Sequence, residues 1–363
     1  MARHGKHKDT PESVTPRRKA NYSVSAGDAF LSDTYDTGSY HRIEAAPVSP
    51  EPVPPKKKRK WLWPLLLAVL LAAAGITAAV LLRSAGTQST PVRKNVSVSM
   101  TDLNGDSCMR VTFLDVGEAD CALIQCGGEA MLIDSGNYAD LSYVKQTLQS
   151  LGVTTLKYII ATHPHEDHIG CMGGLIRAFG VETLYAPSAE YHSDSTCFDV
   201  MNEALAELGK SITVPRANET IRLDSAELTF LSAGKTYENT NDTSLVARLR
   251  YGETVFLFTG DIEWDAEHDL VEAGIDLSAD VLKVPHHGSA SSSSYVFLYQ
   301  VMPRYAVISV GRDNEYGHPD SDVLSRLRDA DAAVLRTDEL GTITCFSDGT
   351  ALVWSFSGSD LSE

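Results

Sequence analysis

The sequence predicts an α/β fold in which two β-sheets pack face to face with helices outside them. Short β-rich runs, separated by Gly and acidic turns, recur over residues 107–358. Helical stretches stand between these runs, and strands dominate each half of the region. A hydrophobic content of 43% in 363 residues supplies enough apolar side chains for a sizeable core.

Residues 1–60 are predicted to form a disordered cytoplasmic tail, because they are polar, rich in Pro and Ser, and lack apolar periodicity. Residues 61–83 are predicted to form a transmembrane helix. The stretch from Trp61 to Leu82 carries no charge, and a helix of this length crosses about 30 Å of hydrocarbon. A cleavable signal peptide fits worse, since the apolar stretch is too long and no clear cleavage site follows.

Basic residues predict the topology of this helix. Five of them, at 56–60, directly precede it, whereas only three follow up to residue 98. The positive-inside bias places the N-terminus in the cytoplasm. We therefore expect a single-pass cell-membrane protein with a linker over 84–106 and an extracytoplasmic domain over 107–358. The basic run also resembles a nuclear-import signal, but beside a membrane helix it is better explained as a topology anchor.

Charge separates the tail from the outer domain. Residues 1–60 hold 12 basic and 7 acidic residues, whereas the part beyond residue 83 holds 18 basic and 41 acidic residues, a net charge of −23. Such a domain repels polyanions at long range, which argues against tight nucleic-acid binding. It does not exclude an enzyme whose metal ions supply local positive charge.

The cysteines give no sign of a zinc knuckle or a thioredoxin site, because no C-x-x-C spacing occurs. All six lie beyond the predicted membrane helix: Cys108, Cys121, Cys126, Cys171, Cys197 and Cys345. We expect most of them to be small core residues, and their pairing stays open. Cys171 is expected to pack inward at the start of a helix rather than to bind metal.

The globular region alternates strands and helices along its length. Strands are expected in the segments 109–116, 121–126, 130–136, 157–162, 227–232, 244–252, 254–261, 280–287, 305–311 and 341–356. Helices are expected in the segments 141–152, 197–209, 264–274 and 321–331.

The segment "THPHEDHIG" at 162–170 follows an expected strand. Alternate residues of an extended segment share a face, so His163 and His165 can grip one cation. The strand yields to a helix near Asp167, which is a plausible N-cap, and Asp167 with His168 can turn toward a second cation. The pattern H-x-H-x-D-H is therefore suited to two adjacent metals.

Two further histidine motifs, "KVPHHGS" and "NEYGHPDS", also follow expected strands. Together with the first motif they contain six of the chain's eleven histidines, which chance explains poorly. The segment "VFLFTGDIE" presents Asp261 after an apolar strand and a Gly, where a carboxylate could bridge two cations. The sequence therefore predicts a metal site.

These motifs resemble the metallo-β-lactamase superfamily, and more narrowly the hydrolase domain of the ComEC competence proteins. The narrower resemblance depends on six motifs in order over about residues 108–356: "FLDVGEADCALI", "THPHEDHIG", "NDTSLVARL", "FTGDIE", "LKVPHHGS" and "YGHP". It implies a four-layer αββα sandwich and a site for two divalent ions, Zn or Mn. The implied metal ligands are His163, His165, Asp167, His168, Asp261 and either His286 or His287.

The resemblance also implies roles beside the metals. Asp115 and Asp134 would orient ligands or loops. Asn241 stands where better-known β-lactamases supply a third histidine to the first metal, so it would be a weaker, harder ligand or would steer the substrate. Together with Asp167, we expect Asn241 and His318 to act in catalysis. His318 could contact a phosphate oxygen or protonate the leaving group, and Ser289 could donate a hydrogen bond to the substrate.

The function expected from this resemblance is a membrane-anchored phosphodiesterase or nuclease. Its substrate would be DNA or another phosphodiester, and a role in DNA uptake would need channel partners. Alternatives on the same fold are a phosphorylcholine esterase, a lactonase or a β-lactamase. A catalytically inactive binding module is the alternative from another class, and the complete ligand set argues against it.

Overall fold

The structure is a computed structural model that describes residues 108–190, 196–232 and 235–358. The predicted tail, transmembrane helix and linker lie outside these described residues, so those predictions stay predictions. Within the described ranges, no helix combines the length and the apolar character needed to cross a bilayer.

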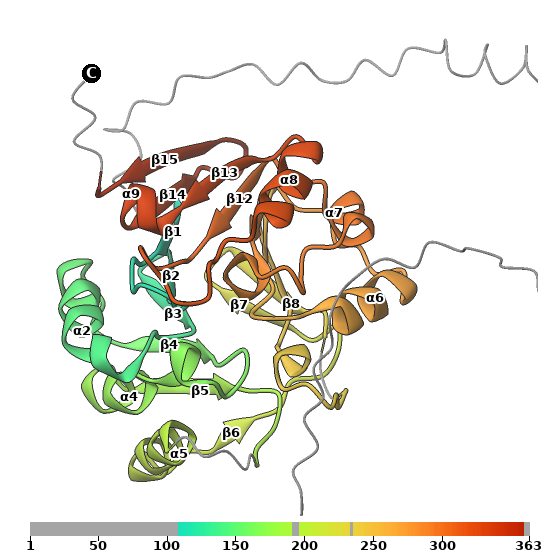
Figure 1. Cartoon of the computed structure of the whole chain (residues 1–363). Coiled ribbons are helices and arrows are strands. Elements are labelled where there is room, and N and C mark those ends of the chain that lie inside the picture. Colours follow the sequence, from blue (N-terminus) through green and yellow to red (C-terminus); the bar gives the residue numbers. More distant parts are fainter. Residues whose placement is uncertain (1–107, 191–195, 233–234, 359–363) are drawn as a thin grey trace, which may run out of the picture. The chain divides into compact units, whose positions relative to one another are not determined.

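Two sheets lie face to face, and helices cover the outer face of each (Figure 1). One apolar cluster fills the space between the sheets, where Phe113 stacks on Phe258 with ring centroids 6.0 Å apart. A second cluster joins the first sheet to the helices α2, α4 and α5, and a third joins the second sheet to α6, α7 and α8. The predicted α/β fold of two packed sheets is confirmed.

The first sheet runs in the order β15-β14-β1-β2-β3-β4-β5-β6. Its strands are β1 Met109–Phe113, β2 Ala122–Cys126, β3 Glu129–Ile133, β4 Leu156–Ile160, β5 Val181–Tyr185, β6 Ile212–Thr213, β14 Ile343–Ser347 and β15 Leu352–Phe356. The pairs from β3 to β6 are parallel, whereas β1 pairs with β2 and β14 antiparallel.

The second sheet runs in the order β13-β12-β11-β10-β9-β8-β7. Its strands are β7 Thr220–Leu223, β8 Ala226–Phe230, β9 Ala247–Tyr251, β10 Thr254–Phe258, β11 Val281–Lys283, β12 Tyr305–Ile308 and β13 Ala333–Arg336. β10 is buried along its whole length, as expected for an apolar strand covered on both faces. β10, β11, β12 and β13 pair in parallel.

The helices and short helical turns complete the element order. The α-helices are α2 Leu141–Ser150, α3 Glu166–Ile169, α4 Met172–Phe179, α5 Cys197–Glu207, α6 Trp264–Glu272, α7 Tyr295–Val301, α8 Ser321–Asp329 and α9 Thr337–Leu340. The 3-10 turns are η2 Tyr138–Asp140, η3 Asn241–Thr243 and η4 Pro285–Gly288. The sequence pattern did not predict helices in the segments of α7 and α9.

The cysteines agree with the expectation of small core residues. Five of the six are buried, and Cys108 is partly buried. Cys171 is fully buried at the start of α4, and its Sγ donates to the carbonyl of Asn137 at 2.8 Å. The inward packing expected for Cys171 is therefore confirmed.

Candidate metal centre

The candidate ligands follow the carboxyl ends of parallel strands. β4 leads into the segment with His163 and Asp167, β10 leads into Asp261, and β11 leads into His287. The carboxyl ends of neighbouring parallel strands lie at one edge, where α/β proteins commonly bind ligands. Because β4 belongs to the first sheet and β10 and β11 to the second, the site lies where the edges of both sheets meet.

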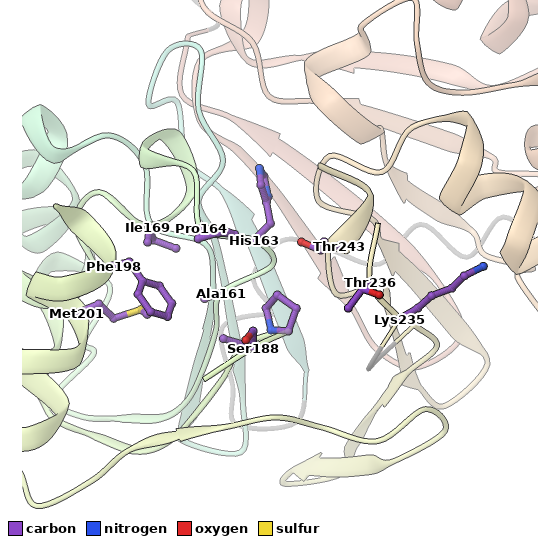
Figure 2. A pocket seen from close by; sticks show the side chains of 12 residues that line it. Ala161, His163, Pro164, Ile169, Ser188, Phe198, Met201, Lys235, Thr236 and Thr243 are labelled. Atoms are coloured by element: carbon purple, nitrogen blue, oxygen red, sulfur yellow. The ribbon is translucent and has the colours of Figure 1, made fainter. Parts of the chain in front are cut away.

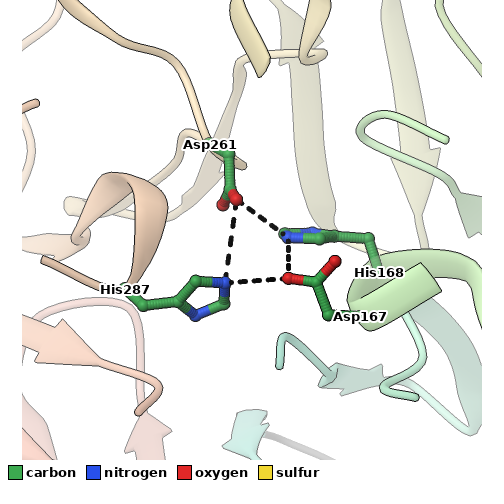
Figure 3. Close-up of side chains that lie close together, drawn as sticks. All are labelled: Asp167, His168, Asp261 and His287. Carbon is green, nitrogen blue, oxygen red and sulfur yellow. Dashed lines mark hydrogen bonds and ion pairs between the residues drawn. The ribbon is translucent and has the colours of Figure 1, made fainter. Parts of the chain in front are cut away.

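Asp167, His168, Asp261 and His287 form a four-residue cluster, in which each offers one atom within 4.8 Å of the others (Figure 3). Nε2 of His168 is 3.2 Å from Asp261 Oδ2 and 3.5 Å from Asp167 Oδ2. Nε2 of His287 is 3.2 Å from Asp167 Oδ2 and 3.7 Å from Asp261 Oδ2. Ligands at about 2.1 Å from a tetrahedral zinc ion lie about 3.4 Å apart. The spacing of the four atoms therefore fits one divalent cation.

Both imidazoles of the four-residue cluster present Nε2 to it. Nδ1 of His168 donates to Asp134 Oδ2 at 2.8 Å, and Nδ1 of His287 donates to the carbonyl of Ser309 at 2.9 Å. A proton held on Nδ1 leaves the Nε2 lone pair for a metal. Nε2 of His168 and Oδ1 of Asp261 are buried without a hydrogen-bond partner among the described residues. Such atoms cost about 1–3 kcal/mol each when unpaired, and a bound cation would satisfy them.

A second group of donors lies beside the four-residue cluster. Nε2 of His163 is 3.0 Å from Nδ1 of His165 and 3.9 Å from Asp261 Oδ2. Asn241 donates its amide nitrogen to Glu263 Oε1 at 2.8 Å, and its Oδ1 is buried with no hydrogen-bond partner in the described part of the chain. His163 and His165 would hold a second cation, and Asn241, which lines the same cavity as His165, offers a further oxygen. Asp261 is close to both groups, which fits a bridging carboxylate.

The helix that follows His165 begins earlier than expected. His165 has the extended backbone of an N-cap, with φ −74° and ψ 152°, and α3 begins at Glu166. Asp167 therefore lies in the first turn of α3, and the prediction that Asp167 is the N-cap is wrong. The helical turn brings Asp167 and His168 to the same cation position.

The histidine pair that follows β11 separates in space. Both His286 and His287 have a left-handed backbone with φ +51°, and their ring centroids lie 6.3 Å apart. His287 joins the four-residue cluster, whereas Nδ1 of His286 lies 3.3 Å from Glu263 Oε1. The sequence left open which of the two is the ligand, and the geometry favours His287. The hydroxyl of Ser289 pairs with that of Ser291 at 3.0 Å, and the expected hydrogen bond from Ser289 to the substrate stays a prediction.

The cluster and its surroundings concentrate negative charge. Four carboxylates lie here, those of Asp120, Asp134, Asp167 and Asp261, and one buried lysine or arginine side chain faces them among the described residues. This side chain is that of Lys283, whose Nζ lies 2.7 Å from Asp120 Oδ2. Buried charge of one sign is costly unless it is paired. Divalent cations would supply the missing positive charge.

These carboxylates also set the charge of the histidines. Burial opposes protonation of His168, but Asp261, Asp167 and Asp134 outweigh burial and raise its pKa well above the usual value. Burial likewise opposes protonation of His287, but the carboxylates raise its pKa to about 9. For His163, burial and the neighbouring His168 lower the pKa well below the usual value. A cation entering the cluster therefore competes with protons on His168 and His287.

Sequence reasoning missed several residues that support the ligands. Asp120 and Lys283 form the buried ion pair, although both stand inside motifs that the sequence singled out. Asp115, expected to orient ligands or loops, shapes a turn: its amide donates to Thr342 Oγ1 at 3.1 Å, and its Oδ1 accepts from Gly117 at 3.4 Å. Neither of these contacts reaches the four-residue cluster, whereas Asp134 contacts His168 directly.

A polar cavity of about 370 Å³ lies against the candidate ligands. Its lining includes His165, Asp167, Asp261, His286 and His287, together with Glu118, Asn137, Glu166, Asn241, Tyr316 and His318. Acceptors and donors therefore surround a space beside the metal positions. This space is large enough for the reacting part of a small substrate.

An apolar cavity of about 100 Å³ lies beside His163 (Figure 2). Its walls include Ile169, Phe198 and Met201 from the first half of the domain and Thr243 from the second. The two cavities share no lining residue. The apolar walls keep one side of His163 away from polar groups, which agrees with the burial that lowers its pKa.

The chain has two packed sheets flanked by helices, and imidazoles and carboxylates gather at one edge of them. This arrangement is typical of the fold of metal-dependent hydrolases. The model of the Metallo-beta-lactamase superfamily matches residues 114–312. The chain belongs to this superfamily, and the sequence-based resemblance is confirmed.

Curated relatives match the same region. The chain is 30% identical over 254 residues to ComE operon protein 3 of Bacillus subtilis (strain 168), covering 64% of this chain and 32% of the relative. It is 31% identical over 240 residues to Competence protein ComA of Neisseria gonorrhoeae, covering 64% and 31%. The chain thus spans about a third of the length of these relatives. Its domain is of the ComEC type.

One solved structure is similar to the chain at low sequence identity. Igni18, described as a novel metallo hydrolase from the archaeon Ignicoccus hospitalis KIN4/I, has a TM-score of 0.46 and 16% identity. The match covers 65% of this chain and 98% of that chain.

Proposed function

We propose that the chain is a binuclear metal-dependent phosphodiesterase or nuclease of the ComEC type. One observation carries this proposal. Strands of both sheets lead into imidazoles, carboxylates and an amide that gather at one polar cavity. Several of their buried ligand atoms have no hydrogen-bond partner among the described residues. The competence relatives support the choice of DNA or another phosphodiester as substrate. The uncharged stretch from Trp61 to Leu82 supports the further proposal of a membrane anchor over residues 61–83 and an extracytoplasmic location.

When bound, two divalent cations would activate a water molecule and stabilise the entering and leaving oxygens of an in-line displacement. The chain's own residues prepare the site. Asp134 and the carbonyl of Ser309 fix the imidazoles of His168 and His287. Lys283 offsets part of the carboxylate charge, and the polar cavity holds the diester beside the ligands.

The ligand set favours a phosphodiesterase over a β-lactamase. Asn241 offers an amide oxygen. By the resemblance, it stands where better-known β-lactamases supply a third histidine to the first metal. An amide oxygen suits a hard ion such as Mn²⁺ better than an imidazole does. Hard ions and oxygen-rich sites are common in phosphoryl transfer.

Substrate profiling tests the proposal. The purified full chain is incubated with labelled DNA, bis-p-nitrophenyl phosphate and nitrocefin, with Mn²⁺ or Zn²⁺ added. We expect diester hydrolysis, and we expect the double variant Asp167→Asn, His168→Ala to lose at least about 10³-fold in rate because it removes two ligands of one cation. Cleavage of nitrocefin alone, or diester cleavage that survives in the double variant, would refute the proposal. If metal analysis finds that neither ion binds, the chain is an inactive module.

A further inference from the structure

The polar cavity contains a hydrogen-bonded pair that metal binding does not explain. Nδ1 of His318 donates to Glu118 Oε1 at 2.7 Å, although the two residues are 200 positions apart. We propose that Glu118 is a positioning residue that fixes His318 as the proton donor to the leaving group of the diester. This inference rests on the proposed function and assigns a role to Glu118, which the sequence did not single out.

Glu118 is held by both of its oxygens. Oε1 accepts from His318, and Oε2 accepts from the amide of Gly311 at 2.8 Å. The side chains of Glu118 and His318 are 15% and 13% exposed, so little water competes for this hydrogen bond. The backbone amide can only donate, and it therefore keeps the carboxylate in one orientation toward the imidazole.

The backbone of His318 is fixed separately. Asn314 Oδ1 accepts from the amide of His318 at 2.9 Å, and Asn314 Nδ2 donates to its carbonyl at 2.7 Å. The ring of Tyr316 stacks on the imidazole with centroids 5.6 Å apart. The position of the ring therefore depends on several contacts, whereas its proton arrangement depends on Glu118.

The imidazole lies near the candidate ligands without joining them. Its centroid is 6.4 Å from that of His287 and 5.7 Å from that of His286, and His318 is not part of the four-residue cluster. With Nδ1 bonded to Glu118, Nε2 is the ring atom left to meet substrate in the cavity. A carboxylate at Nδ1 holds the ring in one orientation and one tautomer, as the aspartate of a catalytic triad does.

The step balances as ordinary hydrolysis. The oxygen of water forms a bond to phosphorus while the bond from phosphorus to the leaving oxygen breaks and its electron pair stays on that oxygen. The proton on Nε2 of His318 passes to this oxygen, giving an alcohol. His318 is left neutral with its remaining proton on Nδ1, still donated to Glu118. The proton released by the attacking water passes to solvent, from which His318 is protonated again.

Two matched substrates test this role. The full chain and the variants Glu118→Gln, His318→Asn and Glu315→Gln are assayed with thymidine 5′-p-nitrophenyl phosphate and with the dinucleotide dTpdT. Proton donation matters when the leaving group is a poorly stabilised alkoxide and matters little for p-nitrophenolate. We expect Glu118→Gln and His318→Asn to lower kcat about 10²-fold or more for the dinucleotide and less than about 3-fold for the p-nitrophenyl ester. Glu315 is exposed on the same loop, and its variant should match the wild type.

The substitution Glu118→Gln should also change the proton arrangement of the ring. The oxygen of the new amide must face the fixed donor of Gly311, so its nitrogen faces Nδ1 of His318 and moves the proton of the neutral ring to Nε2. Nitrogen NMR of the ¹⁵N-histidine-labelled, Zn²⁺-loaded full chain reads this directly, with the His318 signals assigned from His318→Asn. We expect Nδ1–H in the wild type and a changed tautomer in Glu118→Gln.

The outcomes separate the two proposals. An equal loss on both substrates, or no loss on the dinucleotide, would overturn the role of Glu118 while leaving the phosphodiesterase intact. A wild type that cleaves neither diester would refute the proposed function, and the proton-donor role would then fall with it. A neutral Nε2–H ring in the wild type would overturn the positioning role whatever the activity.

Discussion

The substitution Asp134→Asn tests how the metal centre orients its ligands. Asp134 Oδ1 accepts from the amide of Thr162 at 2.8 Å, while Oδ2 accepts from the Thr162 hydroxyl at 2.7 Å and from Nδ1 of His168 at 2.8 Å. The backbone of Asp134 has φ +56°, a conformation that Asn also tolerates. The substitution therefore keeps the shape of the side chain and changes mainly its charge and donors.

An amide cannot satisfy both neighbours of Asp134. If its oxygen stays with the amide of Thr162, its nitrogen faces Nδ1 of His168 and drives the imidazole proton to Nε2, the atom that would bind metal. If the amide turns over, its nitrogen meets the N–H of Thr162. The first arrangement protonates the nitrogen that would bind metal, and the second leaves a buried donor unpaired, which costs about 1–3 kcal/mol. We therefore expect the affinity for Zn²⁺ to fall about 10- to 100-fold.

Competition with a chelator of known affinity measures this change in the full chain. Asp115→Asn is the matched control, because Asp115 also ends a strand segment but contacts a turn rather than a ligand. Equal zinc affinity in the wild type and Asp134→Asn would show that His168 is not a ligand or that its proton arrangement does not matter.

Further predictions concern packing, pH and metal removal. A Cβ at Gly288, where φ is +82°, would lie 2.7 Å from Cβ of Pro319. The substitution Gly288→Ala should therefore lower the free energy of unfolding by about 1–3 kcal/mol. The loss should exceed that of Gly152→Ala, because Gly152 has a similar φ of +81° but open space around it. Equal losses in denaturant unfolding would contradict this reasoning. Burial raises the pKa of Glu267 to about 7. An acid with a raised native pKa binds more protons when folded, so the free energy of unfolding should fall as pH rises from about 4.5 to 7, by at most about 3 kcal/mol. The substitution Glu267→Gln should remove this part of the pH dependence. An unchanged pH dependence of unfolding in that variant would refute the assignment. Chelation should lower the thermal midpoint by roughly 10 °C, because metal held at about 10³ times its Kd contributes about 4 kcal/mol to the native state. Equal midpoints with and without chelator would argue against metal bound by both sheets.

The layers of the fold were predictable from the sequence, because they depend on the local alternation of apolar β-rich runs and helical stretches. Each motif stood after an apolar run, and parallel strands carry such motifs to one edge. A helix start at Cys171 was expected, but the extent of α4 was harder to predict, because its sequence from Met172 to Phe179 contains two glycines, which weaken a helical pattern. The N-cap of α3 was placed two residues late, since His165 has no capping side chain to signal it.

The resemblance indicated the candidate ligands, but it did not indicate the residues that support them. The contact between Glu118 and His318 and the ion pair of Asp120 with Lys283 join distant segments. No local pattern indicates such a pairing, because it depends on how the two sheets align. The choice between His286 and His287 depends on two left-handed residues in one turn, which sequence periodicity cannot resolve.

The strand β1 lies between β2 and β14, with Val111 opposite Cys345. The first sheet can therefore close on this side only after the ribosome has made the C-terminal strands. Contacts so far apart in sequence form slowly, and a chain that waits for them exposes an open edge. The turn that carries Glu118 and Asp120 follows β1, and Asp115 in that turn bonds to Thr342 just before β14. A C-terminal truncation before β14 should therefore leave this wall of the site loose even though every candidate metal ligand is still present.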